Sequence, residues 1–557
     1  MQNYIISIGG TGAKCLEAFV HMNAAGLMEK NDEIKIIYVD PDSGNGNLHK
    51  TMVTVNSYID AYESARLNTI KDIPFFKNKI EPLTKDASWN PVSGGLGGSE
   101  KSLDGIFYPE NMPDSLQKLF YTLYSDEERT TSLSEGFRAH PAIGAAVIGK
   151  NMSMEVSPWK EMVEDITSNG KKARIFLFGS VFGGTGAAGL PNIARIIRKH
   201  FDNEAEGGKN SDIKIAGCLM LPYFNFAAPS DKDKFINKGA DKNEIIVPRS
   251  EDFLANASAA LRYYFEDNFV GVNQNNAKIE HPVFDAVYVL GDKEDNSEFP
   301  KMPGGFAAGC AEQNNPGNFL EMFAALAAID FFNKDEIKSK EYFEKSQYYR
   351  YAIGKDTYID WDDLPKVSSD PNFDVKKKLR AFIRLAYFYR TLVYPKAKEY
   401  EKEPEKYQGE NQEKWISKFI HTKREVGGFL RKKKITEITP EDMGKLESFL
   451  KYCVYFLEWL KDLTYSMNNN FLRCGNLIQK RVYDYAREDD EKGYYIKNKP
   501  IEKLNEIFVD TNSTVNETKY PEAQMVDYKP KDSNSKGIEY LLAMIYDICS
   551  EDVEEGQ

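Results

Sequence analysis

The stretch FGSVFGGTGAAGLPNIARI, Phe178–Ile196, joins an apolar run to an amphipathic one through a cluster of glycines. A strand that ends in glycines and opens a helix brings backbone N–H groups and the positive helix end to one point, where phosphate is the natural occupant. Glycine suits such a loop because a Cβ would keep the backbone away from the anion. The stretch therefore predicts a phosphate-binding loop after a buried strand.

A second loop of this kind, IISIGGTGAKCLEAF, stands at residues 5–19. Neither loop has the GK[ST] ending of a Walker loop. Alone, the N-terminal loop at 5–19 could be a dinucleotide fingerprint. Asp40 ends the next strand, where a dinucleotide enzyme has the carboxylate that binds ribose. Glycines that serve only a tight strand-to-helix turn are the other alternative. The presence of two loops counts against both, since one dinucleotide site needs one fingerprint.

Composition excludes several classes of protein. The 557 residues carry a formal net charge of −13, with a pI near 5.3, which argues against a nucleic-acid partner. The six cysteines form no CxxC pair and the six histidines no HExxH, so we expect buried thiols and no zinc site. We expect no signal peptide, and no apolar run reaches the ~18 residues of a membrane span. The sequence thus predicts a cytoplasmic, soluble protein.

Strand-like and helix-like segments alternate through the first half of the chain. The expected strands are 4–8, 33–39, 173–178, 213–221 and 284–290, and the expected helices are 13–25, 142–150, 190–200, 252–266 and 318–332. Strands separated by helices need crossovers, which predicts an α/β fold with a mainly parallel sheet and helices on both faces. Residues 41–135 show little periodicity. After about residue 366 the patterns are mostly helical, and the chain ends in an acidic tail.

The glycine loops resemble those of the tubulin/FtsZ superfamily, in which several loops at the carboxyl ends of a parallel sheet surround one nucleotide. FGGTGAAG, residues 182–189, is similar to the family's GGGTG[ST]G loop, with Phe182 in place of its first glycine. IGGTGAKCLEAF is similar to the first nucleotide loop, and VDPD at 39–42 occupies the place of the second. GFRAHPAIG at 136–144 is similar to the γ-phosphate-sensing loop. The likeness covers roughly residues 1–390 and is closest to divergent bacterial tubulin-like GTPases.

The same resemblance implies where the sugar and the base would bind. CLMLPYFNF, residues 218–226, resembles the family's TKPFxFEG, with the ribose-binding glutamate replaced by Ala227 or Ala228. FDAVYVLGD matches the strand before a base-binding asparagine and gives Asp292 that place. The run 314–332 fits the helix that joins the two halves of the family fold. Its Asn318, with Asn315 close behind, is the residue implied to contact guanine; a helix N-cap is the alternative interpretation.

An acidic stretch, YIDWDDLP at 358–365, stands where FtsZ has an NxDFAD loop that reaches the nucleotide of the next subunit. The resemblance implies that Asp360, Asp362 and Asp363 orient water or hold Mg²⁺, because phosphoryl transfer needs mainly positioning and charge compensation. A polar turn that caps the next helix is the alternative. The implied protein is a GTPase that assembles head-to-tail into filaments. Some branches of the family lie in prokaryotic conflict or antiphage gene clusters.

The resemblance also implies a set of ligand contacts and a domain plan. GTP or GDP would lie on the glycine loops, with Mg²⁺ held through the phosphates and not by a cluster of protein ligands. The implied nucleotide-binding residues are Gly9, Gly10, Thr11, Gly12, Lys14, Cys15, Asp40, Asp42, Arg138, Gly183, Gly184, Thr185, Gly186, Ala187, Asp292 and Asn318. The implied domains are a nucleotide-binding domain at 1–316 with an insertion near 50–135, a core helix at 317–334, an acidic loop with its following helix at 335–394, and a mostly helical region at 395–557.

Two rival hypotheses remain open from the sequence. The replaced ribose glutamate and the altered acidic loop favour a nucleotide-binding structural or regulatory module without hydrolysis. Asp40 favours an NAD-dependent Rossmann enzyme. The expected partners are further copies of the chain itself and a protein that docks on the helical C-terminal region.

Overall fold

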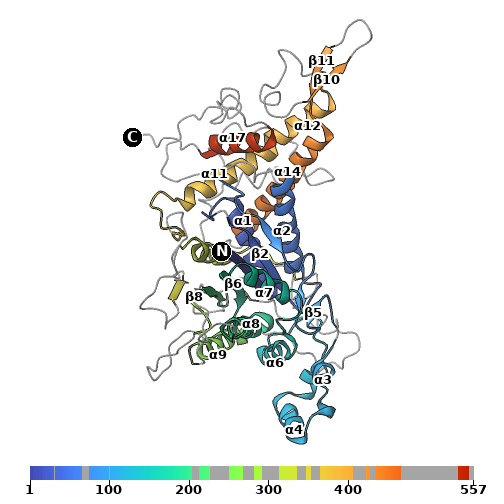
Figure 1. Cartoon of the computed structure of the whole chain (residues 1–557), viewed down its shortest axis with the longest axis vertical. Helices are drawn as coiled ribbons and strands as arrows, with labels where there is room; N and C mark the ends of the chain where they lie inside the picture. Colours follow the sequence, from blue (N-terminus) through green and yellow to red (C-terminus); the bar gives the residue numbers. More distant parts are fainter. Residues whose placement is uncertain are drawn as a thin grey trace. The chain divides into compact units, whose positions relative to one another are not determined.

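The computed structural model describes residues 1–30, 32–64, 74–99, 101–203, 212–225, 250–266, 282–291, 313–334, 347–352, 364–405, 422–426, 433–465 and 537–550. The chain divides into two compact units. Figure 1 labels the helices and strands of the chain. Unit 1 comprises residues 1–19, 32–53 and 80–355, and unit 2 comprises residues 20–31, 54–79 and 356–557. Unit 1 contains the large sheet and the glycine loops.

Unit 1 is built on a nine-stranded sheet in the order β5-β4-β2-β1-β6-β7-β8-β9, with β3 paired to β2. The strands are β1 Gln2–Ile8, β2 Ile34–Val39, β3 Ile80–Pro82, β4 Trp89–Asn90, β5 Gly95–Leu96, β6 Ala173–Ser180, β7 Ile213–Met220, β8 Ala286–Gly291 and β9 Gln347–Ala352. The β4–β5 pair is antiparallel and the other pairs are parallel. The prediction of a mainly parallel sheet is confirmed.

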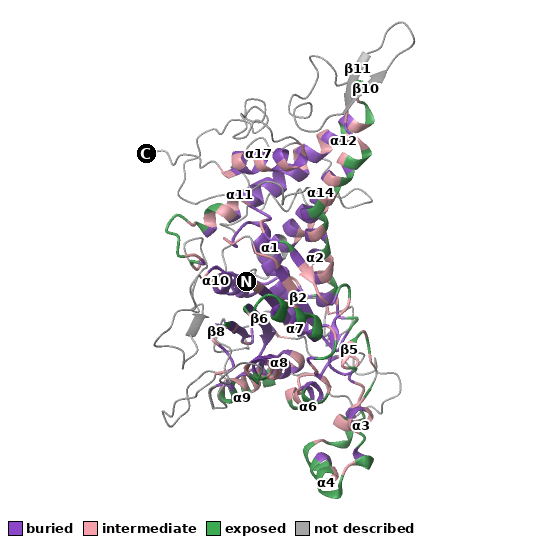
Figure 2. Ribbon diagram, in the orientation of Figure 1, coloured by how far each residue is buried: buried purple, intermediate pink, exposed green. Residues whose placement is uncertain are grey.

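Helices cover both faces of this sheet. The main ones are α1 Gly9–Ala24, α6 Pro141–Asn151, α7 Trp159–Ser168, α8 Gly184–Asn203, α9 Phe253–Glu266 and α10 Phe319–Asn333. Side chains alternate between the faces along β6. Phe176 packs against Phe331 of α10 with ring centroids 5.7 Å apart, whereas Gly179 lies against Leu190 of α8. The predicted two-faced α/β arrangement is therefore confirmed, and Figure 2 shows α10 as almost wholly buried.

Helix α2, Gly46–Ser64, occupies part of the span in which the sequence predicts little periodicity. That expectation is wrong for a physical reason. Polar residues lie at buried positions of this helix, namely Thr51, Thr54 and Ser57, each at most 1% exposed. Thr51 Oγ1 donates to the carbonyls of Ala13 and Asn47, at 2.8 and 2.9 Å, so its hydroxyl is satisfied inside the protein. Buried hydroxyls of this kind conceal the apolar pattern of a helix.

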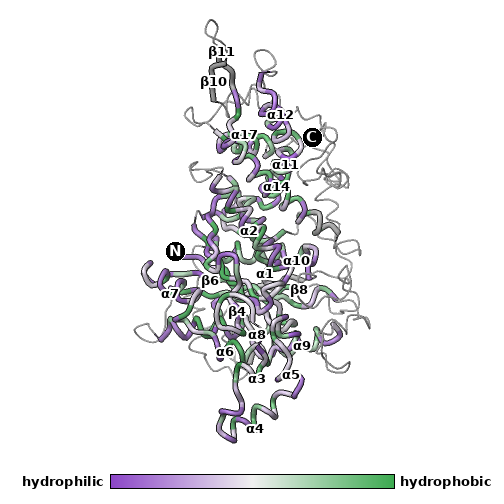
Figure 3. Tube along the Cα trace, turned by 90° about the vertical axis from the view of Figure 1, so that its right-hand side faces the viewer, coloured by the Kyte–Doolittle hydropathy of each residue, from purple (hydrophilic) through white to green (hydrophobic). Residues whose placement is uncertain are grey.

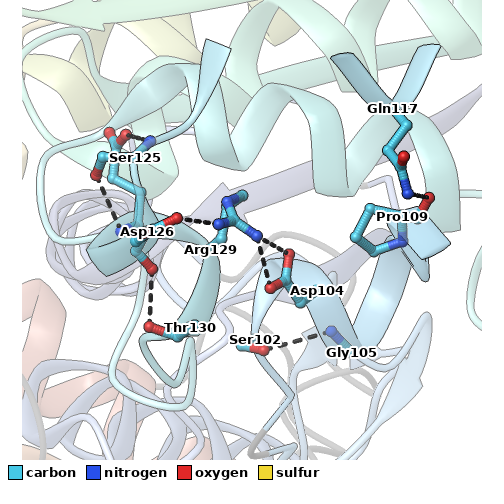
Figure 4. A network of polar contacts seen from close by, with 10 residues as sticks. Ser102, Asp104, Gly105, Pro109, Gln117, Ser125, Asp126, Arg129 and Thr130 are labelled. Carbon is cyan, nitrogen blue, oxygen red and sulfur yellow. Dashed lines mark hydrogen bonds and ion pairs between the residues drawn. The ribbon is translucent and has the colours of Figure 1, made fainter. Parts of the chain in front are cut away.

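Residues 101–131 hold three short helices, α3 Leu103–Phe107, α4 Asp114–Leu123 and α5 Asp126–Thr130. Arg129 connects α5 to α3, because its guanidinium donates to both oxygens of Asp104, at 3.0 and 3.2 Å, and also to Asp126 (Figure 4). Glu128 of the same helix contacts His140 Nδ1 at 3.1 Å. This segment thereby braces the loop at 136–144, the stretch that resembles a γ-phosphate-sensing loop.

The described part of unit 2 is mostly helical, as predicted. It includes α11 Val375–Phe388, α12 Tyr394–Lys402, α14 Pro440–Tyr465, α17 Ile538–Ser550 and an antiparallel hairpin of β10 Thr422–Val426 and β11 Lys433–Glu437. Figure 3 shows hydrophobic residues along α11, α14 and α17. Its core is aromatic: His21 lies among Tyr452, Phe456 and Trp459, with ring centroids 4.8–5.7 Å from its own.

Candidate functional site

The strand order places a topological switch point between β1 and β6. The chain passes from β1 to β2 on one side and later returns to β6 on the other side of β1. In open α/β sheets, ligands bind outside the carboxyl ends of the strands at such a point. Helix α1 begins at Gly9, directly after β1, and helix α8 begins at Gly184, shortly after β6 ends at Ser180. The two glycine loops are thus the two sides of one crevice.

The starts of α1 and α8 meet at this crevice. A Cβ built on Gly9 would lie 3.3 Å from the Cβ of Thr185 and 3.6 Å from the backbone nitrogen of Gly186. Gly10, Thr11, Gly183 and Thr185 are partly exposed, so a ligand can reach the starts of both helices. Each helix start presents free N–H groups and a partial positive charge. Two such starts in contact favour a polyanionic ligand that lies across both.

A third loop, residues 136–144, lies against the second. A Cβ on Gly184 would stand 2.9 Å from the nitrogen of Ala139 and from the carbonyl carbon of Phe137, so the backbones approach as closely as glycine allows. Arg138 and Ala139 have φ of +45° and +64°, in the left-handed region that non-glycine residues seldom adopt. Backbone strain of this kind concentrates at ligand-binding loops. The guanidinium of Arg138 donates to Glu135 at 3.0 Å.

The turn between β2 and α2 uses its acidic side chains for its own backbone. Oδ1 of Asp40 accepts from the Asp42 N–H at 3.0 Å, and Oδ1 of Asp42 accepts from the Gly44 N–H at 3.0 Å. Asp40 is 3% exposed, and this burial raises its pKa to about 8, against the lowering effect of the Asp42 N–H. A largely protonated, turn-bound Asp40 near neutral pH is a poor match for the ribose carboxylate of a dinucleotide enzyme.

A buried ion pair ties the first loop to the core helix α10. Nζ of Lys14 lies 2.5 Å from Oε1 of Glu321, and both side chains are at most 3% exposed. The hydroxyl of Tyr223, just beyond β7, donates to the same oxygen at 2.7 Å. Burial, and then the charge of Glu321, raise the pKa of Tyr223, while a hydrogen bond with Thr11 lowers it. The charge of Lys14 is therefore neutralised by Glu321 inside the protein.

Asn318 acts as the N-cap of α10. Its Oδ1 accepts from the Leu320 N–H at 2.9 Å, and its own N–H donates to Glu321 at 2.8 Å, which completes a capping box. This geometry matches the N-cap interpretation of Asn318, and among the described residues Nδ2 has no hydrogen-bond partner. Glu321 consequently serves three groups: Lys14, Tyr223 and the backbone of Asn318.

Cys15 and Ala187, two further predicted nucleotide contacts, are both buried. Cys15 is fully buried, and burial, with the nearby Cys218 and Glu321, raises the pKa of its thiol. Ala187 is 9% exposed in the first turn of α8. The four described cysteines, Cys15, Cys218, Cys453 and Cys549, are buried free thiols, as predicted.

Phe182 forms an aromatic floor under the second loop. It is 2% exposed and packs against Phe253, Phe224 and Tyr223, with ring centroids 4.8, 5.6 and 6.4 Å away. The Phe182 ring is thus part of the aromatic core beneath the loop.

Several predicted residues lie outside the described part of the chain. They are Asp292, Ala227, Ala228 and the acidic residues Asp360, Asp362 and Asp363. Within the described ranges, no group of three or more His, Cys, Asp or Glu side chains could hold a metal ion. None of the helices in those ranges is both long and apolar enough to cross a membrane.

The structure adds site residues that the sequence interpretation missed. They are Asn45 and Asn47 at the start of α2, Gln313 before α10, and the pair Tyr223 and Glu321; Asn315, which the sequence already indicated, lies with them. Asn45 Nδ2 donates to Gln313 at 2.5 Å, and the Asn315 N–H donates to Asn47 Oδ1 at 2.7 Å. Two signals in the sequence pointed to them: the run NGN at 45–47, two residues after VDPD, and the capping-box spacing NFLE at 318–321.

No protein-family model and no curated protein matches this chain. Two archaeal proteins of known structure are similar to it. A GTPγS-bound protofilament of CetZ2 from Haloferax volcanii is 14% identical, with 61% of each chain covered and a TM-score of 0.25. CetZ from Methanosaeta thermophila strain DSM 6194 is also 14% identical, with 58% of this chain and 52% of that chain covered and a TM-score of 0.23. The chain thus spans half to three fifths of the length of these proteins.

Proposed function

We propose that this chain binds a guanosine nucleotide, GTP or GDP, at the switch point, with the phosphates on the starts of α1 and α8. The observation that carries the proposal is the close approach of the two helix starts, where a Cβ built on Gly9 would lie only 3.3 Å from the Cβ of Thr185. Both loops follow adjacent parallel strands, so one polyphosphate can accept N–H groups from both. Gly9, Gly10, Thr11 and Gly12 would hold one part of it, and Gly183 to Ala187 the other.

The choice of guanine and the reaction rest on the resemblance of the loops to the tubulin/FtsZ superfamily. Asn318 would contact the base through Nδ2, with Asp292 near it. Asp360, Asp362 and Asp363 of one subunit would reach the γ-phosphate held by the next, with Mg²⁺ on the phosphates. Such a head-to-tail contact is heterologous and does not close, so it produces filaments. A role in an antiphage or conflict system stays a prediction.

The first test identifies the bound nucleotide. The protein is purified without added ligand and denatured, and the released nucleotide is separated by ion-exchange chromatography. GTP or GDP is expected; a nicotinamide dinucleotide would instead favour the Rossmann enzyme. The protonated, turn-bound Asp40 supports the first outcome.

The second test concerns hydrolysis. Phosphate release per subunit from GTP is measured over a range of protein concentrations. A site completed by the next subunit requires the rate per subunit to rise with concentration, alongside light scattering from filaments. A rate that stays constant would contradict the shared site, and tight GTP binding without turnover would support the non-hydrolysing module.

A further inference from the structure

Asn47 has two chemically different ends at the proposed site. Its side chain is 2% exposed and lies in the first turn of α2. Oδ1 accepts from the Asn315 N–H at 2.7 Å and so holds the segment that leads into α10. Nδ2, which carries two N–H donors, has no hydrogen-bond partner among the residues that the structure describes. Within the described residues, Nδ2 is not among the fully enclosed side-chain atoms that lack a partner, so water or a ligand that accepts its hydrogens can reach this end of the amide.

The helix that carries Asn47 does not account for this amide. Asn45 already caps α2, because its Oδ1 accepts from the N–H groups of Asn47 and Leu48 at 3.0 and 3.1 Å. Asn45 Nδ2 is also engaged, since it donates to Gln313. The two neighbouring asparagines thus differ: Asn45 uses both ends of its amide inside the protein, and Asn47 uses only one.

The unused end is directed at the first glycine loop. A Cβ built on Gly10 would lie 3.3 Å from Asn47 Nδ2, closer than to any other group outside its own helix; Asn45 Nδ2 follows at 3.5 Å. Gly10 is the second residue of α1, and the N–H groups of that first turn have no partner within the helix. The amide therefore adds side-chain donors beside backbone donors at a positive helix end. Atoms that only accept hydrogen bonds and carry negative charge suit this arrangement, and phosphate oxygens have both properties.

We propose that Asn47 binds a phosphate group of the ligand through Nδ2, and that Gly10 is glycine because this amide must reach the loop. The inference deepens the proposed function and rests on its location of the phosphates. Through Oδ1 and Asn315, the same side chain connects the phosphates to the segment before α10.

The experiment compares Asn47→Asp with the wild-type chain by isothermal titration calorimetry with GTP, guanosine and inorganic tripolyphosphate. The aspartate retains an oxygen that accepts from Asn315 but replaces the donor by an anionic oxygen. Loss of a hydrogen bond to a charged group weakens binding by about 10- to 100-fold, and repulsion adds to it, so we expect GTP and tripolyphosphate to bind more than about 100-fold more weakly. Guanosine affinity should stay unchanged.

Two further variants control for structure. Asn47→Ala removes the donor without adding charge and should weaken GTP binding by about 10- to 100-fold. Asn169→Asp makes the same substitution at an exposed position directly after α7, outside the site, so its GTP affinity should stay within about threefold of the wild type. Thermal melting of all variants shows whether they remain folded.

The outcomes separate this inference from the proposed function. Equal GTP affinity of wild type, Asn47→Asp and Asn47→Ala would overturn the phosphate contact while guanosine-nucleotide binding stands. If the Asn47 variants lost as much affinity for guanosine as for GTP, the phosphate contact would also be overturned, because Asn47 would then contact the nucleoside. If the wild type binds tripolyphosphate but no guanosine nucleotide, the proposed function fails. The inference then depends only on whether Asn47→Asp weakens the affinity for tripolyphosphate.

Discussion

The two glycine-initiated helices that meet at the crevice are supported in opposite ways. Helix α1 is surrounded by polar groups: the buried pair Lys14–Glu321 lies against one side, and the amides of Asn45 and Asn47 lie against Gly10. Helix α8 rests on close backbone packing and on the aromatic floor around Phe182. The difference indicates that polar and charged contacts position the α1 side of the site, whereas close packing fixes the shape of the α8 side. Substitutions that change charge should therefore lower stability most at α1, whereas substitutions that change side-chain volume should lower stability or GTP affinity at α8.

The largest effect is expected for Glu321→Gln. The amide is nearly isosteric but leaves the Lys14 ammonium buried without its counter-charge, which should lower the free energy of unfolding by about 3–5 kcal/mol. Urea denaturation measures the loss. The matched control is Lys14→Met combined with Glu321→Gln, which removes both charges and should recover a large part of the stability. Additive losses in the double variant would show that the two charges are not coupled.

Asp40 gives the second test on the α1 side of the crevice. Because burial raises its pKa to about 8, the folded chain binds more protons than the unfolded chain between the ordinary aspartate range and pH 8. The contribution of Asp40 to stability is therefore complete at low pH and is lost as pH rises. An asparagine side chain at this position cannot titrate, so Asp40→Asn should gain about 3 kcal/mol relative to the wild type between about pH 5 and pH 8. Urea denaturation of both chains at several pH values measures the gain, and a constant difference across that range would contradict the raised pKa.

Gly186→Ala tests the shape of the α8 side. The new Cβ would lie 2.6 Å from the carbonyl oxygen of Ser180 and 2.7 Å from its nitrogen, and a backbone cannot move aside as a side chain can. Overpacking of this kind should cost about 2 kcal/mol of unfolding free energy and displace the loop, so GTP affinity should fall with it. Gly149→Ala on α6 is the control, because no atom lies within 4 Å of its Cβ position and alanine favours the helix. Equal stability of the two variants would refute the close approach.

The fold was largely predictable from the sequence because strand and helix patterns depend on local periodicity. Buried runs such as 173–178 identify parallel strands, and glycines after them mark the loops. The start of α8 was placed too late, at Leu190 instead of Gly184, because glycine-rich segments have low helix propensity and only tertiary packing makes them helical.

The pairing of polar residues in the site could not be predicted from the sequence. Glu321 and Lys14 are more than 300 positions apart, and Asn47 meets Asn315 across a similar separation. Nothing in the local pattern around Lys14 distinguishes a phosphate ligand from half of a buried ion pair. The orientation of Phe182 was undetermined for the same reason, because its partners Tyr223, Phe224 and Phe253 come from later in the chain.

Phe182→Leu should have the smallest effect and completes the comparison. Leucine keeps an apolar side chain beneath the loop but loses ring contacts with Phe253 and Phe224, so we expect a loss of about 1 kcal/mol in the free energy of unfolding. GTP affinity should change by less than about threefold, because Phe182 is 2% exposed and is part of the aromatic core beneath the loop. Calorimetric titration and urea denaturation of the same preparation measure both quantities. A large fall in affinity with unchanged stability would mean that the ring contacts the ligand, and the division between a polar α1 side and a shape-determining α8 side would then fail.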